Sequence, residues 1–257
     1  MTINNVTYLS VLLNSASNKP YSDINSIVKL ANCELADLNF ASKRIYSFTK
    51  PTVDVKDVEM YTIDEVAYEN FTRCVISTYP KMFDSEFMIN FHCDGFIINP
   101  ESWSDEFLEY DYIGAPFDAG GTLPPSAGNG GFSLRSKKFC EEVKDLYMNV
   151  PDQHPLLSEN WKSLPEDFIT CFILREDLIH RGIKFAPFEV ASKFATEHLA
   201  YKDENFYNSF GFHEFSAVSN EDLEKVPLNV DKKYISKNSK EGVAMRKKIH
   251  QSIFNEN

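Results

Sequence analysis

The chain has 257 residues, with 26 Lys and Arg against 38 Asp and Glu and a formal net charge of −12. This acidic balance excludes a general nucleic-acid binder, because binding to a phosphate backbone needs a positive surface. Hydrophobic residues make up 43% and charged residues 25%, which is typical of a folded globular protein rather than a disordered chain.

The N-terminal part of the chain predicts two strands separated by a helix. Residues 6–13 are apolar and β-branched, which indicates a buried strand. Residues 22–36 carry apolar positions at helical spacing, and residues 43–48 predict a second strand. This β-α-β order favours an α/β fold with a parallel sheet flanked by helices.

The middle of the chain predicts further elements of the same kind. Residues 62–78 have the spacing of a helix, residues 87–92 and 96–98 predict strands, and residues 112–116 predict an extended segment. Residues 118–131 are rich in Gly and Pro and predict a loop. A loop of this length inside a compact domain is typical of a functional segment.

The remaining elements complete one domain. Residues 132–135 predict a strand, residues 136–147 and 166–180 predict two helices, and residues 183–186 predict a late strand. The sequence beyond residue 220 is polar. We therefore predict one domain over residues 1–219 and a peripheral C-terminal extension over residues 220–257.

The five cysteines are odd in number, scattered, and contain no C-x-x-C pair. This pattern argues against a disulfide framework or a zinc knuckle and favours a reducing compartment. No stretch approaches the roughly 18–20 apolar residues of a membrane span, and no signal-peptide pattern is visible. We therefore predict a cytoplasmic protein without a membrane span.

Four residues at the end of the predicted 87–92 strand form the first candidate site: His92, Cys93, Asp94 and Gly95. A carboxylate there would lie at the carboxyl edge of the sheet, where ligands bind in open α/β folds, and Mg²⁺ and Mn²⁺ prefer oxygen ligands. Gly95 would let a phosphate or a ribose approach the backbone. An ordinary Asp-Gly turn between two strands explains the same residues.

The second candidate is the glycine-rich segment around Asn129, Gly130 and Gly131, which is followed by Arg135. Exposed amides and the Asn129 side chain could bind a sugar hydroxyl or a phosphate. The alternative is a flexible loop tip. The segment is not a Walker loop, because Gly-Lys-Ser/Thr is missing.

Two later segments add acids and a histidine. Glu166 and Asp167 follow Pro165 and could supply a general base, although Pro and acids are also common at an ordinary helix N-terminus. His213 lies between aromatic residues, where a histidine is more often structural than a ligand. If it returns to the sheet edge, its imidazole suits Mn²⁺ better than Mg²⁺.

Taken together, these segments resemble an uncharacterised bacterial and viral family that is described as glycosyltransferase-like, with a GT-A fold. The resemblance covers roughly residues 62–215. It rests on four motifs: Phe-His-Cys-Asp-Gly at residues 91–95, Tyr-Asp-Tyr-Ile-Gly-Ala-Pro at 110–116, Gly-Asn-Gly-Gly-Phe-Ser-Leu-Arg at 128–135, and Phe-Gly-Phe-His at 210–213.

The resemblance implies a GT-A-like, Rossmann-type mixed sheet, mainly parallel, and a metal-dependent, inverting glycosyltransferase. Its partners would be a UDP- or GDP-sugar donor, a hydroxyl of a glycan-type acceptor, and Mn²⁺ or Mg²⁺ as the cation. By the same resemblance, Asp94 and His213 bind the cation. His92 stands where the first acid of the metal motif would be and where the family more often has Gln. Asp167 is the preferred base and Glu166 the reserve.

Two other functions remain open from the sequence. One is a non-catalytic module that binds a sugar nucleotide or a glycan on the same scaffold. The other is a metal-dependent phosphoester hydrolase or nucleotidyltransferase, although such enzymes usually cluster more carboxylates around two cations.

Overall fold

The computed structural model describes residues 2–13, 24–32, 38–67, 70–92, 95–97, 99–116, 128–150, 162, 164–197 and 209–213. Its strands are β1 (Thr2–Leu12), β2 (Asn39–Ser47), β3 (Glu59–Thr62), β4 (Phe87–Phe91), β5 (Gly95–Ile97), β6 (Tyr112–Pro116), β7 (Gly128–Ser136), β8 (Ala195–Thr196) and β9 (Gly211–His213). Its helices are α1 (Ile24–Ala31), α2 (Phe71–Met82), α3 (Lys137–Asn149), α4 (Glu166–Phe168), α5 (Arg175–His180) and α6 (Phe188–Phe194), with 3-10 helices η2 (Pro100–Ser102) and η3 (Asp105–Glu109) and a π-helix, η5 (Ile169–Ile173).

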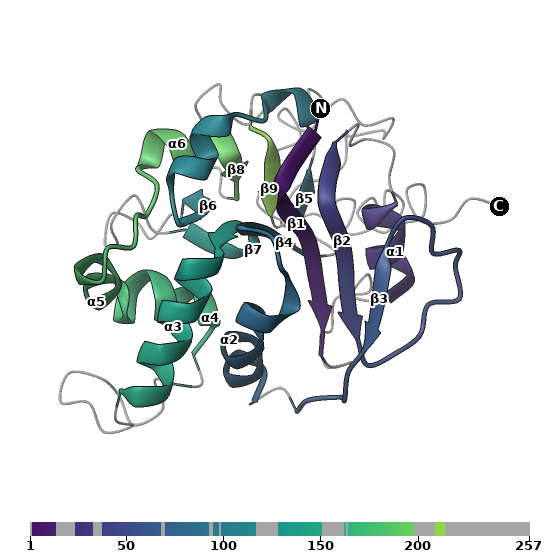
Figure 1. The fold of residues 1–257 in the computed structure, drawn as a ribbon, viewed down its shortest axis with the longest axis horizontal. Helices are drawn as coiled ribbons and strands as arrows, with labels where there is room; N and C mark the ends of the chain where they lie inside the picture. Colours follow the sequence, from purple (N-terminus) through teal and green to yellow (C-terminus); the bar gives the residue numbers. More distant parts are fainter. Residues whose placement is uncertain are drawn as a thin grey trace, which may run out of the picture.

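The central sheet has six strands in the order β3-β2-β1-β4-β7-β6 (Figure 1). The first four of these strands run parallel to one another. β7 is antiparallel to both of its neighbours, so β6 again runs in the direction of β4. The sheet is therefore mixed and mainly parallel, which confirms the predicted α/β fold class.

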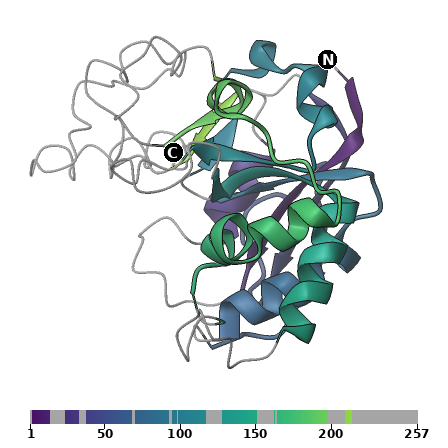
Figure 2. The same cartoon turned by 90° about the vertical axis from the view of Figure 1, so that its left-hand side faces the viewer.

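The side chains of successive strand residues point to opposite faces and build two separate cores. Tyr8 and Ile89 pack with α1 and α6 in one core, whereas Leu9 and Met88 pack with α2 and α3 in the other. Figure 2 shows α2, α3 and the α4–α5 segment on one side of the sheet and α6 on the other. Helices thus cover both faces, as a mainly parallel sheet requires.

A second, small sheet lies beyond the end of β4 and has the order β5-β9-β8. The chain reverses between His92 and Gly95, whose backbones exchange N–H···O bonds of 3.0 and 3.2 Å. β5 then pairs with β9, which places Gly95 opposite His213. This pairing carries the late histidine to the carboxyl end of β4, as its predicted role requires.

The predicted helix over residues 62–78 is wrong at both ends. Thr62, the first residue of the predicted helix, is instead the last residue of β3, which pairs with β2 at the edge of the sheet, from Arg44 with Glu59 to Ser47 with Thr62. The helix α2 starts at Phe71 and continues through Pro80, whose neighbours Tyr79 and Met82 are buried in the core. Strand pairing and core packing thus override the helical spacing of the sequence.

The predicted glycine-rich loop is also wrong at its C-terminal end, because β7 begins at Gly128 rather than after Gly131. Gly128 pairs with Pro116, and a Cβ atom built on Gly114 would lie 2.1 Å from the carbonyl oxygen of Asn129. These glycines therefore serve a close approach of two strands, which a larger residue would prevent. Residues 117–127 lie outside the described residues.

Two smaller differences concern the second half of the chain. The predicted helix over residues 166–180 is divided into α4, η5 and α5. The predicted strand over residues 183–186 forms only an isolated bridge between Phe185 and Tyr112. The boundary at residue 219 and the C-terminal extension lie outside the described residues.

Candidate functional site

The candidate site lies where the strand order of the sheet changes direction. From β1 the chain continues to β2 on one side, and it later returns to place β4 on the other side. Ligands of open α/β sheets bind outside the carboxyl ends of the strands at such a switch point. The residues at this edge are His92 after β4 and Asn129, Gly130 and Gly131 at the start of the antiparallel β7.

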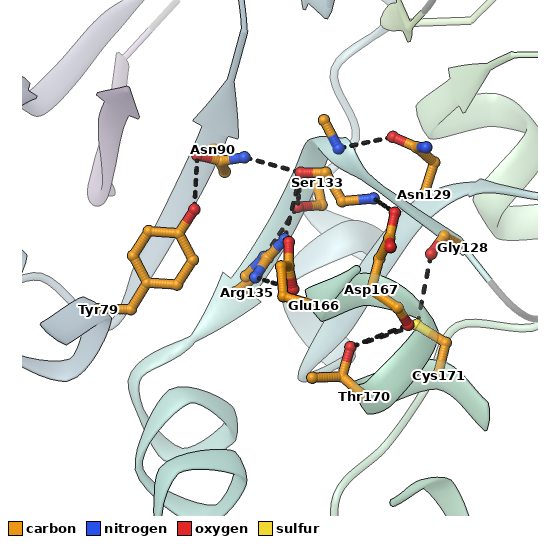
Figure 3. Close-up of polar contacts among 12 residues, drawn as sticks. Tyr79, Asn90, Gly128, Asn129, Ser133, Arg135, Glu166, Asp167, Thr170 and Cys171 are labelled. Atoms are coloured by element: carbon orange, nitrogen blue, oxygen red, sulfur yellow. Dashed lines mark hydrogen bonds and ion pairs between the residues drawn. The ribbon is translucent and has the colours of Figure 1, made fainter. Parts of the chain in front are cut away.

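Figure 3 shows the polar side chains of the site, among them Asn90, Ser133, Arg135 and Asp167. The backbone of Gly130 links these four side chains. Its carbonyl oxygen accepts three side-chain hydrogen bonds: from Asn90 Nδ2 at 2.7 Å, Ser133 Oγ at 3.1 Å and Arg135 Nη2 at 3.2 Å. Its N–H donates to Asp167 Oδ2 at 3.0 Å. These contacts fix the carboxylate of Asp167 relative to the ends of β4 and β7.

Arg135 and Glu166 form a buried, bidentate ion pair below Gly130, with N···O distances of 3.0 and 2.6 Å. The guanidinium lies against the rings of Tyr79 and Tyr112, 5.1 and 5.5 Å from their centroids. Burial disfavours the charged form of Arg135 and is the largest single effect, but Glu166, Tyr112 and Tyr79 together outweigh it, so the pKa of Arg135 is raised well above its usual value. The pair thus supports Gly130 from within the protein.

Asp167 is half-buried next to this pair. Its Oδ2 accepts the Gly130 N–H, and its Oδ1 accepts the N–H of Phe168 at 2.8 Å. Burial, followed by the negative charge of Glu166, raises the pKa of Asp167 from 3.8 to about 6, although the two N–H donors act in the opposite direction. Such a carboxylate is ionised at neutral pH and is more basic than an ordinary one, which suits a general base.

Two histidines lie on the other side of Gly130, with ring centroids 6.0 Å apart. Asn90 Nδ2 lies 3.3 Å from His92 Nε2, and His213 Nδ1 lies 3.2 Å from Glu197 Oε1. The His213 ring occupies the space that side chains at Gly95 and Gly131 would fill: a Cβ atom on Gly131 would lie 2.1 Å from His213 Nε2. The two glycines are therefore required for the position of this imidazole.

The described structure brings together nine of the eleven residues that the sequence singled out: His92, Gly95, Asn129, Gly130, Gly131, Arg135, Glu166, Asp167 and His213. The other two, Cys93 and Asp94, lie outside the described residues. Among the residues that the structure describes, no group of three or more His, Cys, Asp and Glu is arranged to hold a metal ion.

No motif in the sequence predicted a site role for four residues: Tyr79, Asn90, Ser133 and Glu197. Asn90 had a usable signal, because it is the one polar residue of the buried strand Phe-Met-Ile-Asn-Phe, and a polar group buried there must be hydrogen-bonded. Tyr79 Oη donates to Asn90 Oδ1 at 3.1 Å, and Glu197 Oε1 accepts from Asn129 Nδ2 at 3.0 Å. Glu197 follows β8 with no motif around it, so nothing in the sequence pointed to it.

Comparisons with known proteins give a family but no activity. The model of a family described as "Protein of unknown function (DUF5672)" matches residues 52–213. No curated protein matches the chain at a significant level. One solved structure that is similar to this chain is described as the "crystal structure of a glycosyltransferase involved in the glycosylation of the major capsid of PBCV-1". The two structures superimpose with a TM-score of 0.47 and share 16% sequence identity, and the match covers 87% of this chain and 99% of that chain.

No helix within the described ranges has the length and apolar composition that crossing a membrane requires.

Proposed function

The chain belongs to the family described as "Protein of unknown function (DUF5672)", and we propose that it is a metal-dependent glycosyltransferase. It would transfer a sugar from a UDP- or GDP-sugar to a hydroxyl of a glycan-type acceptor, with inversion. The observation that carries the proposal is the position of Asp167. A carboxylate with a raised pKa is fixed by Gly130 at the ligand-binding edge of the sheet, and the same Gly130 is linked through Asn90 to a pair of histidines.

We propose that a divalent cation binds near His213. The Nδ1 of His213 faces the buried carboxylate of Glu197, which is the arrangement that commonly orients metal-binding histidines. Asp94 directly precedes Gly95, and Gly95 pairs with His213. We propose Asp94 and His213 as ligands, with His92 as the third candidate, and imidazole favours Mn²⁺ over Mg²⁺. A cation bound there would neutralise the charge that develops on the departing nucleotide diphosphate.

The protein's own residues would then orient the acceptor and remove its proton. The acceptor hydroxyl would attack the anomeric carbon from the face opposite the departing diphosphate, which inverts the configuration. Asp167 would take the proton of this hydroxyl as the new bond forms, with Gly130 N–H holding Oδ2 in place. Glu166 would be a positioning residue, because both of its oxygens already bind Arg135.

Transfer assays with an Asp167→Asn variant test the base. Asn keeps an oxygen for the Gly130 N–H but cannot accept a proton, so transfer should fall by about 10²-fold or more while donor binding persists. Asp111→Asn is the matched control, since Asp111 also accepts a backbone N–H, from Lys184 at 2.9 Å, but lies at the opposite end of β7. Full transfer by the Asp167→Asn enzyme would exclude Asp167 as the base.

A thermal-shift panel tests the reaction class. UDP- and GDP-sugars with Mn²⁺ should stabilise the protein by about 2.7 kcal/mol at a hundredfold excess over Kd, and EDTA should remove the effect. Stabilisation by phosphoesters alone would indicate a hydrolase or nucleotidyltransferase instead. Stabilisation by sugar nucleotides without transfer to any acceptor would indicate a binding module.

A further inference from the structure

An exposed aromatic ring lies next to the proposed base. Of the four large hydrophobic side chains that are exposed in the described ranges, Phe168, at 37%, is the one that directly follows a residue of the site. Its ring packs against that of Phe172, with centroids 4.9 Å apart and an angle of 38° between the planes. We propose that these two rings, here called the aromatic platform, bind the acceptor by stacking on the C–H face of a sugar ring. This inference rests on the proposed function and adds an acceptor subsite to it.

The backbone of α4 places the platform beside the carboxylate of the base. Asp167 and Phe168 are consecutive, and Asp167 Oδ1 accepts the N–H of Phe168 at 2.8 Å. Side chains of a helix lean toward its N-terminal end, so both lean toward the end at which Asp167 Oδ2 accepts the Gly130 N–H. The residues on either side of this pair, Glu166 and Ile169, are buried, so the pair is the part of the turn that solvent reaches. A ligand that approaches Asp167 from solvent therefore comes next to the ring of Phe168.

The chain after Phe168 holds the platform in place. It forms the π-helix η5, in which the N–H of Leu174 donates to the carbonyl oxygen of Ile169 at 2.8 Å. A π turn is rare and occurs frequently at functional sites. The three residues between the two rings are buried, and Phe172 packs against the core that contains α2 and α3. The platform is therefore fixed before a ligand arrives, which reduces the entropy lost on binding.

The size and the place of the platform select its occupant. A stable protein partner covers about 800 Å² of surface, whereas complete burial of one aromatic side chain removes only about 150–250 Å². Two partly buried rings are thus too small to bind a protein partner on their own. A pyranose has C–H groups on its faces and hydroxyls around its edge, so stacking on the platform leaves a hydroxyl free to reach Asp167. Small-molecule sites combine aromatic surface with a few placed polar groups in this way.

Replacement of Phe168 should separate acceptor binding from donor binding. Phe168→Leu keeps an apolar side chain but removes the flat ring, so the affinity for a sugar should fall about tenfold. Phe168→Trp keeps an aromatic face and should restore the affinity to within about twofold of wild type. The matched control is Tyr61→Leu, because Tyr61 is equally exposed, at 38%, but lies on β3 at the far edge of the sheet. This control should bind the sugar as wild type does.

Ligand-detected NMR with the methyl glycosides of glucose, galactose, mannose and N-acetylglucosamine tests the platform without any transfer. The protein is deuterated except at its Phe rings, and saturation of these rings should pass to the C–H protons on one face of the sugar. Titration of the same glycosides gives the affinities of wild type and of the three variants. Absence of binding of all four glycosides to wild type, or equal affinities of wild type and Phe168→Leu, would overturn the inference.

Donor binding separates this inference from the proposed function. UDP- and GDP-sugars with Mn²⁺ should bind wild type and Phe168→Leu with affinities within about twofold of each other, whereas Asp167→Asn should keep its affinity for the glycoside and lose transfer. In transfer assays, Phe168→Leu should raise the acceptor KM about tenfold and change kcat by less than about threefold. Equal losses of donor and glycoside affinity in Phe168→Leu would indicate a structural role and overturn the inference. A wild type that binds a glycoside through Phe168 but binds neither sugar nucleotide would overturn the proposed function, and the sugar subsite would stand.

Discussion

Replacement of Asp167 by Asn should stabilise the protein at alkaline pH and not at acidic pH. The pKa of Asp167 is raised from 3.8 to about 6 in the folded protein, so the folded state holds the proton of this carboxyl more tightly than the unfolded state does. This difference stabilises the folded protein fully below pH 4, and the stabilisation is lost as the pH rises through 6. At 1.36 kcal/mol per pKa unit, the shift corresponds to an upper bound of about 3 kcal/mol. Because the side chain is half-buried and partly screened by solvent, we expect about 1 kcal/mol.

For a chain of this size, 1 kcal/mol corresponds to about 2–4 °C in Tm. Thermal unfolding of wild type and Asp167→Asn at pH 4 and pH 8 measures this effect. The Tm of the variant minus the Tm of wild type should be about 2–4 °C larger at pH 8 than at pH 4. Asp111→Asn removes the same charge from a chain of net charge −12 and controls for the change in overall repulsion. A Tm difference between Asp167→Asn and wild type that is equal at both pH values would refute the reasoning.

Three further results follow from the site. Gly131→Ala should lower Mn²⁺ affinity about tenfold or more in a calorimetric titration, because its Cβ would overlap the His213 ring, whereas Ser133→Ala should not. Glu166→Gln should lower the free energy of unfolding, measured in urea, by about 3–5 kcal/mol, because it leaves Arg135 unpaired in the interior. Replacing both Arg135 and Glu166 by apolar residues should lower it less, and equal losses would contradict a buried ion pair. EDTA should abolish sugar transfer, and added Mn²⁺ should restore it. If neither EDTA nor Asp94→Ala reduces transfer, a catalytic cation is excluded.

Local patterns were sufficient to predict the layers of the fold. Apolar runs predicted β1 and β4, and the helical spacing of apolar residues predicted α1 and α3. The pairing of strands was not predictable in the same way. β3 is a short edge strand that no local pattern predicted, and the first residues of β7 are glycines that local rules assign to a loop.

The composition of the site was easier to predict than the roles of its residues. Asp167 and His213 stand out as an acid and a histidine, and the fold brings them to one edge. The sequence could not show that Glu166 faces Arg135 rather than solvent, since helix position alone leaves neighbouring acids equivalent. Nor could it show that Asn90 links Gly130 to His92, because that link depends on the antiparallel register of β4 and β7.

The pairing of β5 with β9 also has a consequence for the order in which the molecule assembles. Gly95 and His213 lie side by side in space but far apart in the chain, and the loop between them contains β6, β7 and the helices from α3 to α6. Closing so large a loop is slow compared with local folding. During synthesis on the ribosome, the central sheet can form before His213 has emerged. The imidazole of His213 then joins Glu197 after the sheet has formed, so a nascent chain would acquire its sheet before it acquires a complete site.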